Sequence, residues 1–208
     1  MGELCQPFGT KIFCALYKTY KVVYNFFMLI LASASPRRKT LLKEIANDFE
    51  VVVSTFEENA LLLAPKDLAT YFAKQKALQV ASEHPNDVVI GADTIVVLKD
   101  EVLGKPKDDN HARQMLLSLS GKSHLVYTAF CIVGNGQLIE DFDKTKVYFK
   151  TLSKKDVDDY VATGSPLDKA GAYGIQDCNF VEKIEGSYSN VMGLPQEKIA
   201  ICLKQFDL

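Results

Sequence analysis

The sequence predicts a mixed α/β fold in which helices flank one twisted β-sheet. The apolar run at 88–98 has the composition and length of a strand that crosses the middle of a sheet. Two further strand-like runs, 124–134 and 137–149, are joined by Gly134-Asn135-Gly136, a hairpin signal. Because segments with helical spacing alternate with strands elsewhere, we expect the sheet to contain both parallel and antiparallel pairs.

The first part of the chain alternates between strand and helix signals. An apolar run at 28–32 is bounded by turn residues, which is typical of a buried strand. Pro36 then opens a helix at the position where a missing N–H costs nothing. The elements expected here are a strand at 28–32, a helix at 36–46, a strand at 49–54 and a helix at 67–82.

The second part continues with two hairpins and three helices. The strand at 88–98 is expected to turn back through Lys99-Asp100-Glu101 to Val102-Leu103. Ser153 caps a helix that has Asp156 three positions after the cap. The other elements expected are a helix at 108–119, the two hairpin strands, a helix at 153–162, a mainly loop segment at 164–189 and a closing helix at 195–206.

The composition is that of an ordinary globular chain. Of 208 residues, 48% are hydrophobic and 24% charged, and the net charge is −2, so no basic excess favours nucleic acid as a partner. The five cysteines form no CxxC pair, and the three histidines lack metal-ligand spacing. We therefore expect reduced thiols and a cytoplasmic location.

Residues 1–27 are interpreted as an N-terminal appendage of unknown role, ahead of a domain at 28–208. The appendage is mildly apolar, but Lys18 and Lys21 interrupt it, so no membrane segment is predicted. No cleavage pattern favours a signal peptide. Met28, immediately before the first strand, is an alternative start.

The turn between the first strand and the first helix, SASPRR at 33–38, has the outline of an anion site. Such a turn aims unpaired backbone N–H groups at one point, and two serine hydroxyls and two guanidinium groups lie beside it. In a simpler interpretation, Ser35 is an ordinary N-cap and both arginines are solvated. However, Arg37 and Arg38 are unfavourable at the positive end of a helix unless an anion compensates them.

Asp93 stands inside the apolar strand, where an unpaired carboxylate is costly. Such a buried acid has a cation, a metal or a reacting water beside it, or else it caps neighbouring backbone. Charged residues elsewhere could join it: Glu57, Glu58, Lys76 and Lys105. These residue types are suited to a site in which Arg and Lys bind a polyphosphate and carboxylates hold a divalent cation.

The segment at 167–176 alternates small and polar residues. It is either a tightly packed loop or a place where backbone approaches a ligand closely, with Gln176 free to pair with a base edge. His124 and Thr128, on the strand pattern at 124–134, are interpreted as equally suited to a structural role.

Eight motifs, in order, resemble the Maf family of nucleoside triphosphate pyrophosphatases, once described as septum formation proteins. They are SASPRRKTLL, the FEE at 56–58, AKQKA, GADTIV, GKP, LSGKSHLVYTAF, LDKAGAYGIQ and GSYSNVMGLP. The resemblance runs from Met28 to about Lys198. It implies a Maf/ITPase-like fold with two lobes around a nucleotide cleft, and a homodimer. It also implies hydrolysis between the α and β phosphates of a nucleoside triphosphate, with Mg²⁺ or Mn²⁺.

The resemblance also implies roles for individual residues. The polyphosphate would be held by Ser33, Arg37, Arg38, Lys76 and Lys105. Glu58 and Asp93 would manage metal and water, with Asp93 as general base. GADTIV together with KAGAYGIQ is similar to the branch that acts on dTTP and UTP. Thr94, Gln176 and Arg37 would then be specificity positions, with Gln176 pairing to the pyrimidine edge.

The chain departs from the family pattern at two places. Asp177-Cys178-Asn179 replaces a glycine-rich stretch after Gln176, and Ser165 replaces an acidic residue before Pro166. Three alternatives remain open. They are a nucleotide-binding regulator of cell division with weak catalysis, a pyrophosphatase specific for 7-methyl-GTP, and a dimerising interaction protein.

Overall fold

A computed structural model describes residues 27–59 and 61–208, so the predicted appendage lies outside the described residues apart from Phe27. Strands β1 to β7 form one sheet in the order β2-β1-β3-β5-β6-β7, with β4 paired to β3. β1 is parallel to β2 and β3, and the remaining pairs are antiparallel. The predicted mixed sheet is confirmed. The strands are β1 (Leu29–Leu31), β2 (Glu50–Val51), β3 (Val88–Leu98), β4 (Glu101–Leu103), β5 (Ser123–Gly134), β6 (Gln137–Phe149) and β7 (Val181–Glu185).

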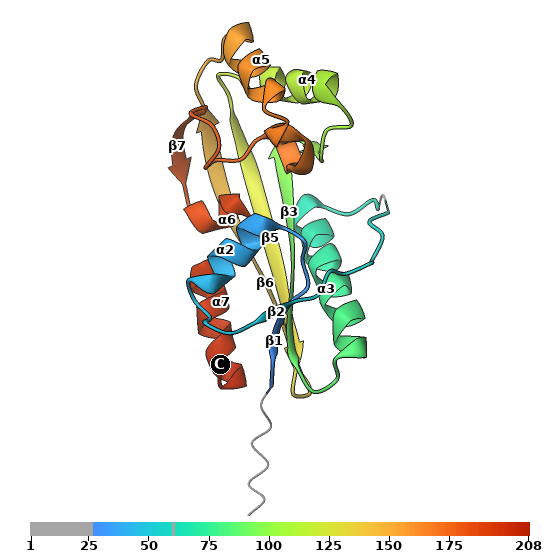
Figure 1. Cartoon of the computed structure of the whole chain (residues 1–208). Coiled ribbons are helices and arrows are strands. Elements are labelled where there is room, and N and C mark those ends of the chain that lie inside the picture. Colours follow the sequence, from blue (N-terminus) through green and yellow to red (C-terminus); the bar gives the residue numbers. More distant parts are fainter. Residues whose placement is uncertain (1–26, 60) are drawn as a thin grey trace, which may run out of the picture.

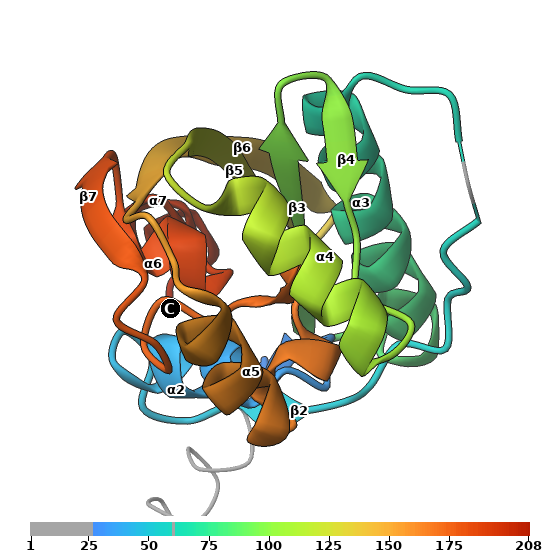
Figure 2. The same ribbon diagram turned by 90° about the horizontal axis from the view of Figure 1, so that it is seen from above.

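Helices cover both faces of the sheet and one of its ends. In Figure 1, α3 follows one side of the long strands, α2 and α7 lie on the other, and α4 and α5 cover the end where β3 finishes. The view from above in Figure 2 shows the same arrangement. The helices are α2 (Pro36–Lys43), α3 (Pro65–Glu83), α4 (Asp109–Leu119), α5 (Lys154–Ala162), α6 (Tyr188–Met192) and α7 (Gln196–Leu203). None of these described helices is long and apolar enough to span a bilayer.

Several expected boundaries were wrong. β2 contains only two residues, both exposed, because it pairs with β1 alone at the edge of the sheet. α2 ends at Lys43, short of the expected 46. The segment at 164–189 is more ordered than expected: it contains 3₁₀-helices at Ser165–Asp168 and Ala170–Ala172, strand β7 and the start of α6. β7 has the sequence VEKIE and lies at the edge of the sheet, and its three charged residues leave too few apolar ones to predict a strand from the sequence. The strand forms because it pairs with β6.

Strand β3 divides the core, because successive side chains of a strand point to opposite faces. Residues 91, 95 and 97 face α3, as the packing of Ile95 and Val97 against Ala69 and Ala73 shows. On the other face, Ile90 and Ala92 pack with α2 and α7 in a first lobe. Val96 and Leu98 pack with α4 and α5 in a second lobe. Thr94 therefore lies on the face between the two apolar lobes, and Asp93 lies on the face towards α3.

Candidate functional site

A cavity of about 600 Å³ opens where the two lobes meet, a volume in the range of ligand pockets. Its walls come from the β1–α2 turn, α3, the middle of β3, the segment after β4 and the loop at 168–176. All nine residues predicted for the site line it: Ser33, Arg37, Arg38, Glu58, Lys76, Asp93, Thr94, Lys105 and Gln176. The structure therefore brings them together, while their individual roles stay predictions.

Arg38 is a half-buried cation at the start of α2 that three hydrogen bonds hold in place. Its Nη1 donates to Ser33 Oγ at 3.1 Å, its Nη2 to Thr94 Oγ1 at 3.1 Å and its Nε to the Gly193 carbonyl at 2.8 Å. Burial lowers the pKa of Arg38 from its usual value, while the charge of Asp93 acts in the opposite direction. The expected N-cap is present, since Ser35 Oγ accepts from the Arg38 N–H, but the first turn of α2 has no acidic residue. A positive helix end with a half-buried arginine is suited to an anion.

A second charged group lies on the α3 side of β3. Lys76 Nζ lies 2.7 Å from Asp93 Oδ1 and 2.5 Å from Glu58 Oε1. Burial raises the pKa of Asp93 above its usual value, although the charges of Lys76 and Arg38 act in the opposite direction. Burial also acts to raise the pKa of Glu58, but the hydrogen bond and charge of Lys76 outweigh it and the pKa is lowered. Asp93 is thus a carboxylate of increased basicity that one lysine holds in place.

Thr94 is linked to Arg38 through a directed chain of hydrogen bonds. Thr128 Oγ1, opposite Thr94 in the β3–β5 pairing, donates its single proton to the Asn190 carbonyl at 2.8 Å. In the 3.0 Å contact between the two threonines, Thr128 must therefore accept and Thr94 must donate. Thr94 Oγ1 in turn accepts from Arg38. The Thr94 hydroxyl proton is already used, so this residue acts chiefly by orienting Arg38.

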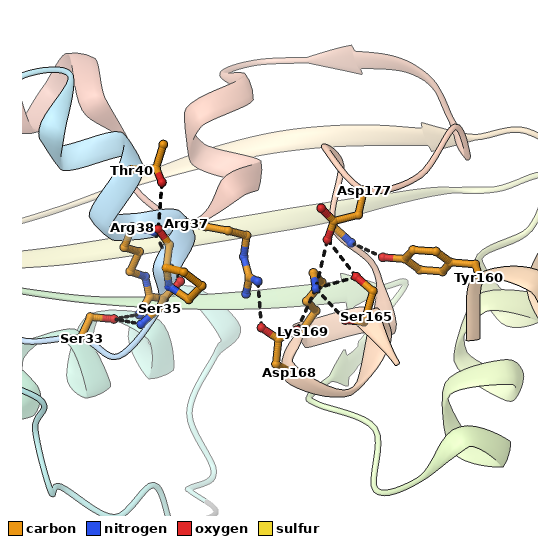
Figure 3. Close-up of polar contacts among 12 residues, drawn as sticks. Ser33, Ser35, Arg37, Arg38, Thr40, Tyr160, Ser165, Asp168, Lys169 and Asp177 are labelled. Carbon is orange, nitrogen blue, oxygen red and sulfur yellow. Dashed lines mark hydrogen bonds and ion pairs between the residues drawn. The ribbon is translucent and has the colours of Figure 1, made fainter. Parts of the chain in front are cut away.

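Arg37 reaches across the cavity to the second lobe. Its Nη1 lies 2.9 Å from Asp168 Oδ2, an ion pair between α2 and a 3₁₀-helix 131 positions later (Figure 3). Gln176 also lines the cavity. Lys105, exposed after β4, also lines it, and its charge contributes to the lowered pKa of Glu58.

His124 has a structural position. It is 2% exposed, its Nε2 lies 2.7 Å from the Tyr173 hydroxyl, and its ring packs against Phe149 and Tyr173. Burial lowers its pKa to about 4. It does not line the cavity, so it belongs to the core of the second lobe.

Sequence reasoning missed how several residues hold the site together. Thr128, for which only a structural role was considered, lies on β5 opposite Thr94, and Asn190 on α6 hydrogen-bonds to it. Both are fully buried. Asp168 and Lys169 hold the loop that contains Gln176. The sequence signal that could have identified these residues is a polar side chain within an apolar or glycine-rich segment. The spacing of residues along the chain, however, does not predict which loops come together in the fold.

Comparisons with known proteins agree with this geometry. The chain matches the profile of the family described as Maf-like protein over residues 28–206. A protein of Bacillus cytotoxicus named dTTP/UTP pyrophosphatase is 48% identical over 182 residues, covering 86% of this chain and 95% of the relative. A protein of the same name from Pyrococcus abyssi is 46% identical over 179 residues, covering 85% of this chain and 95% of the relative.

One solved structure, the Ham1 protein of Staphylococcus aureus, aligns at 14% identity with a TM-score of 0.44, covering 86% of this chain and 96% of that one. A similarity at that level carries no argument about function. The family match and the two relatives each cover most of the chain, and the family match, over residues 28–206, includes every residue that lines the candidate site. The chain belongs to the Maf-like protein family.

Proposed function

We propose that this chain is a nucleoside triphosphate pyrophosphatase that hydrolyses dTTP and UTP to the monophosphate and pyrophosphate. The observation that supports this most strongly is a buried carboxylate, Asp93, beside Lys76 in a cavity of about 600 Å³ that four further predicted polyphosphate-binding residues line. The relatives named dTTP/UTP pyrophosphatase support the same reaction and substrates.

In this reaction a water oxygen bonds to the α-phosphorus, and the bond from that phosphorus to the α–β bridging oxygen breaks. Asp93 accepts the proton that the water loses, and Lys76 keeps the carboxylate facing the cavity. The electron pair of the broken bond stays on the leaving pyrophosphate. Arg37, Arg38 and Lys105 offset its charge, because fixed cations stabilise the transition state of phosphoryl transfer.

A divalent cation, Mg²⁺ or Mn²⁺, fits the residues present. Glu58 and Asp93 offer carboxylate oxygens that converge on one point, now contacted by the Lys76 ammonium. The described residues contain no group of three or more His, Cys, Asp or Glu side chains able to hold a metal. Mg²⁺ commonly takes one or two carboxylates and completes its shell with water and substrate phosphates, so the pair Glu58 and Asp93 is the set that would hold it. When bound, such an ion supplies electrostatic stabilisation of phosphate charge.

Base selection is proposed to involve Gln176, whose amide can pair with the edge of a pyrimidine. Arg37 would act from the opposite wall of the cavity, and Thr94 would act by orienting Arg38.

The three described thiols, Cys131, Cys178 and Cys202, are all free, which supports a cytoplasmic location. The family resemblance supports a homodimer, which sedimentation of the purified chain tests.

Pyrophosphate release from a panel of nucleoside triphosphates tests the proposal directly. We expect turnover of dTTP and UTP with Mg²⁺ or Mn²⁺, and loss of turnover with chelator.

Glu58→Gln should raise the metal concentration needed for half-maximal rate, while Glu57→Gln, one position earlier, serves as the matched control. Release from 7-methyl-GTP alone would keep the reaction and overturn the substrates. No release from any nucleotide would favour a binding regulator.

Thr128→Val is expected to raise the KM for dTTP by about two- to tenfold. The Thr94 hydroxyl loses the acceptor that fixes its direction towards Arg38, and a neutral hydrogen bond contributes about 0.5–1.5 kcal/mol. Thr128→Ser keeps the hydroxyl and should stay near the wild-type KM. Steady-state kinetics on the two variants distinguish lost orientation from a general packing defect. An equal KM for both variants would contradict the chain of hydrogen bonds.

A further inference from the structure

Lys169 is a buried ammonium group in the turn between the two 3₁₀-helices. Its side chain is 7% exposed, yet it lines the cavity. Nζ lies 2.6 Å from the Ser165 carbonyl, 3.0 Å from Ser165 Oγ, 2.8 Å from Asp168 Oδ1 and 3.1 Å from Asp177 Oδ2 (Figure 3). An ammonium has three protons, so four acceptors within the protein already use all of them. Lys169 is therefore built to hold protein groups and not to bind substrate.

One arm of this arrangement leads to Arg37. Asp168 uses Oδ1 for Lys169 and Oδ2 for Arg37, so a single carboxylate joins the two cations. The Asp168 side chain is 57% exposed, and Lys169 is the more buried of its two partners. The position of Asp168, and with it the direction of Arg37 across the cavity, thus depends on Lys169.

The other arm leads to Gln176. A Cβ built on Gly174 would lie 2.7 Å from Lys169 Cε, 2.7 Å from Asp177 Oδ2 and 2.8 Å from Gln176 Nε2. The three side chains therefore converge over this glycine. Gly174 is itself held, because its N–H donates to the Tyr160 hydroxyl at 3.1 Å and its carbonyl accepts from the Asp177 N–H at 3.0 Å. Moving Asp177 away from Lys169 would shift the neighbouring amide of Gln176.

Both departures from the family pattern contact Lys169. Ser165 Oγ also donates to Asp177 Oδ2 at 3.0 Å, so Ser165, Lys169 and Asp177 form one closed group. Because Ser165 Oγ lies 3.0 Å from the ammonium, a carboxylate introduced at position 165 is within reach of it. Asp177 supplies that negative charge from the other side of Lys169.

We propose that Lys169 is a positioning residue for base selection, which holds Arg37 through Asp168 and Gln176 through Asp177. This proposal rests on the proposed function, in which Arg37 and Gln176 select the base. In this chain Asp177 provides the negative charge that faces Lys169, and position 165 holds a serine. We expect that a carboxylate at position 165 could provide this charge in place of Asp177.

The test compares kcat and KM for dTTP and dCTP, which differ at the pyrimidine edge, in the full-length chain. Lys169→Met should raise the KM for dTTP by about tenfold or more and reduce the dTTP/dCTP preference in kcat/KM by about the same factor, with a smaller change in kcat. An unchanged dTTP/dCTP preference, or a loss confined to kcat, would overturn the proposal.

A reciprocal pair of substitutions keeps the test decisive if Lys169→Met does not fold. Asp177→Asn should reduce the dTTP/dCTP preference, Ser165→Asp alone should bring two carboxylates together and reduce it too, and the double variant should restore it. Additive losses in the double variant would overturn the proposal. Absence of dTTP and UTP turnover in the wild-type chain would instead count against the proposed function. The two failures are therefore distinguishable.

Discussion

Asp93→Asn is expected to slow pyrophosphate release by about 10²–10⁴-fold, the usual contribution of a general base. The substitution keeps the shape of the side chain and an oxygen that can accept the hydrogen bond from Lys76, now 2.7 Å away. It removes the group that takes the proton from water, and it also weakens one of the two carboxylates proposed to hold the cation, so turnover is measured at saturating Mg²⁺. Because burial raises the pKa of Asp93, the native carboxylate is a better proton acceptor than an exposed aspartate. The loss should therefore appear in kcat with KM little changed.

Two controls separate loss of chemistry from loss of structure. Binding of a dTTP analogue with a methylene group between the α and β phosphates should persist in Asp93→Asn, as should the thermal unfolding midpoint. Asp100→Asn, an exposed aspartate in the turn that follows the same strand, should leave turnover as in the wild type. Turnover within about tenfold of wild type in Asp93→Asn would contradict the assignment of a general base.

The local features of the site could be predicted from the sequence because they depend on near neighbours. The strand–turn–helix at 29–43 follows from an apolar run, an N-capping Ser35 and Pro36. Asp93 could be singled out because a carboxylate in an 11-residue apolar strand requires compensation. The bounds of β3 and β6 agree with the expected ones for the same reason, since long period-two or apolar patterns are the clearest strand signals.

The contacts between distant segments could not be predicted. Arg37 meets Asp168 across 131 positions, and Thr128 meets Asn190 across 62. Spacing along a chain does not say which loops the sheet order brings together. α6 and β7 were missed because each is five residues long and depends on packing or pairing with β6. The residues of the site could thus be predicted from the sequence. The hydrogen bonds and ion pairs that hold these residues in place depend on the tertiary fold and could not be predicted.

Gly91→Ala is expected to destabilise the fold by about 1–3 kcal/mol, although position 91 contacts no substrate. A Cβ there would lie 2.3 Å from the Ala73 carbonyl oxygen, 2.7 Å from Ala77 N and 2.9 Å from Ala77 Cβ. The first two of these atoms belong to the backbone of α3, so no side chain can rotate away. Helix α3 must move, and Ala69, Ala73 and Ala77, all fully buried, show how closely it packs on the sheet.

The displacement of α3 should also reduce catalysis, because α3 carries Lys76. Residues 91 and 93 share one face of β3, so an outward shift of the helix would lengthen the 2.7 Å contact between Lys76 and Asp93. We expect the unfolding midpoint to fall by about 2–4 °C per kcal/mol lost, together with a lower kcat measured well below that midpoint. Gly104→Ala is the stability control, since a Cβ there meets nothing within 4 Å. If Gly91→Ala lowered the midpoint and left kcat intact, the close approach of α3 would serve stability alone, and the geometry of Lys76 would tolerate more movement than the buried ion pair implies.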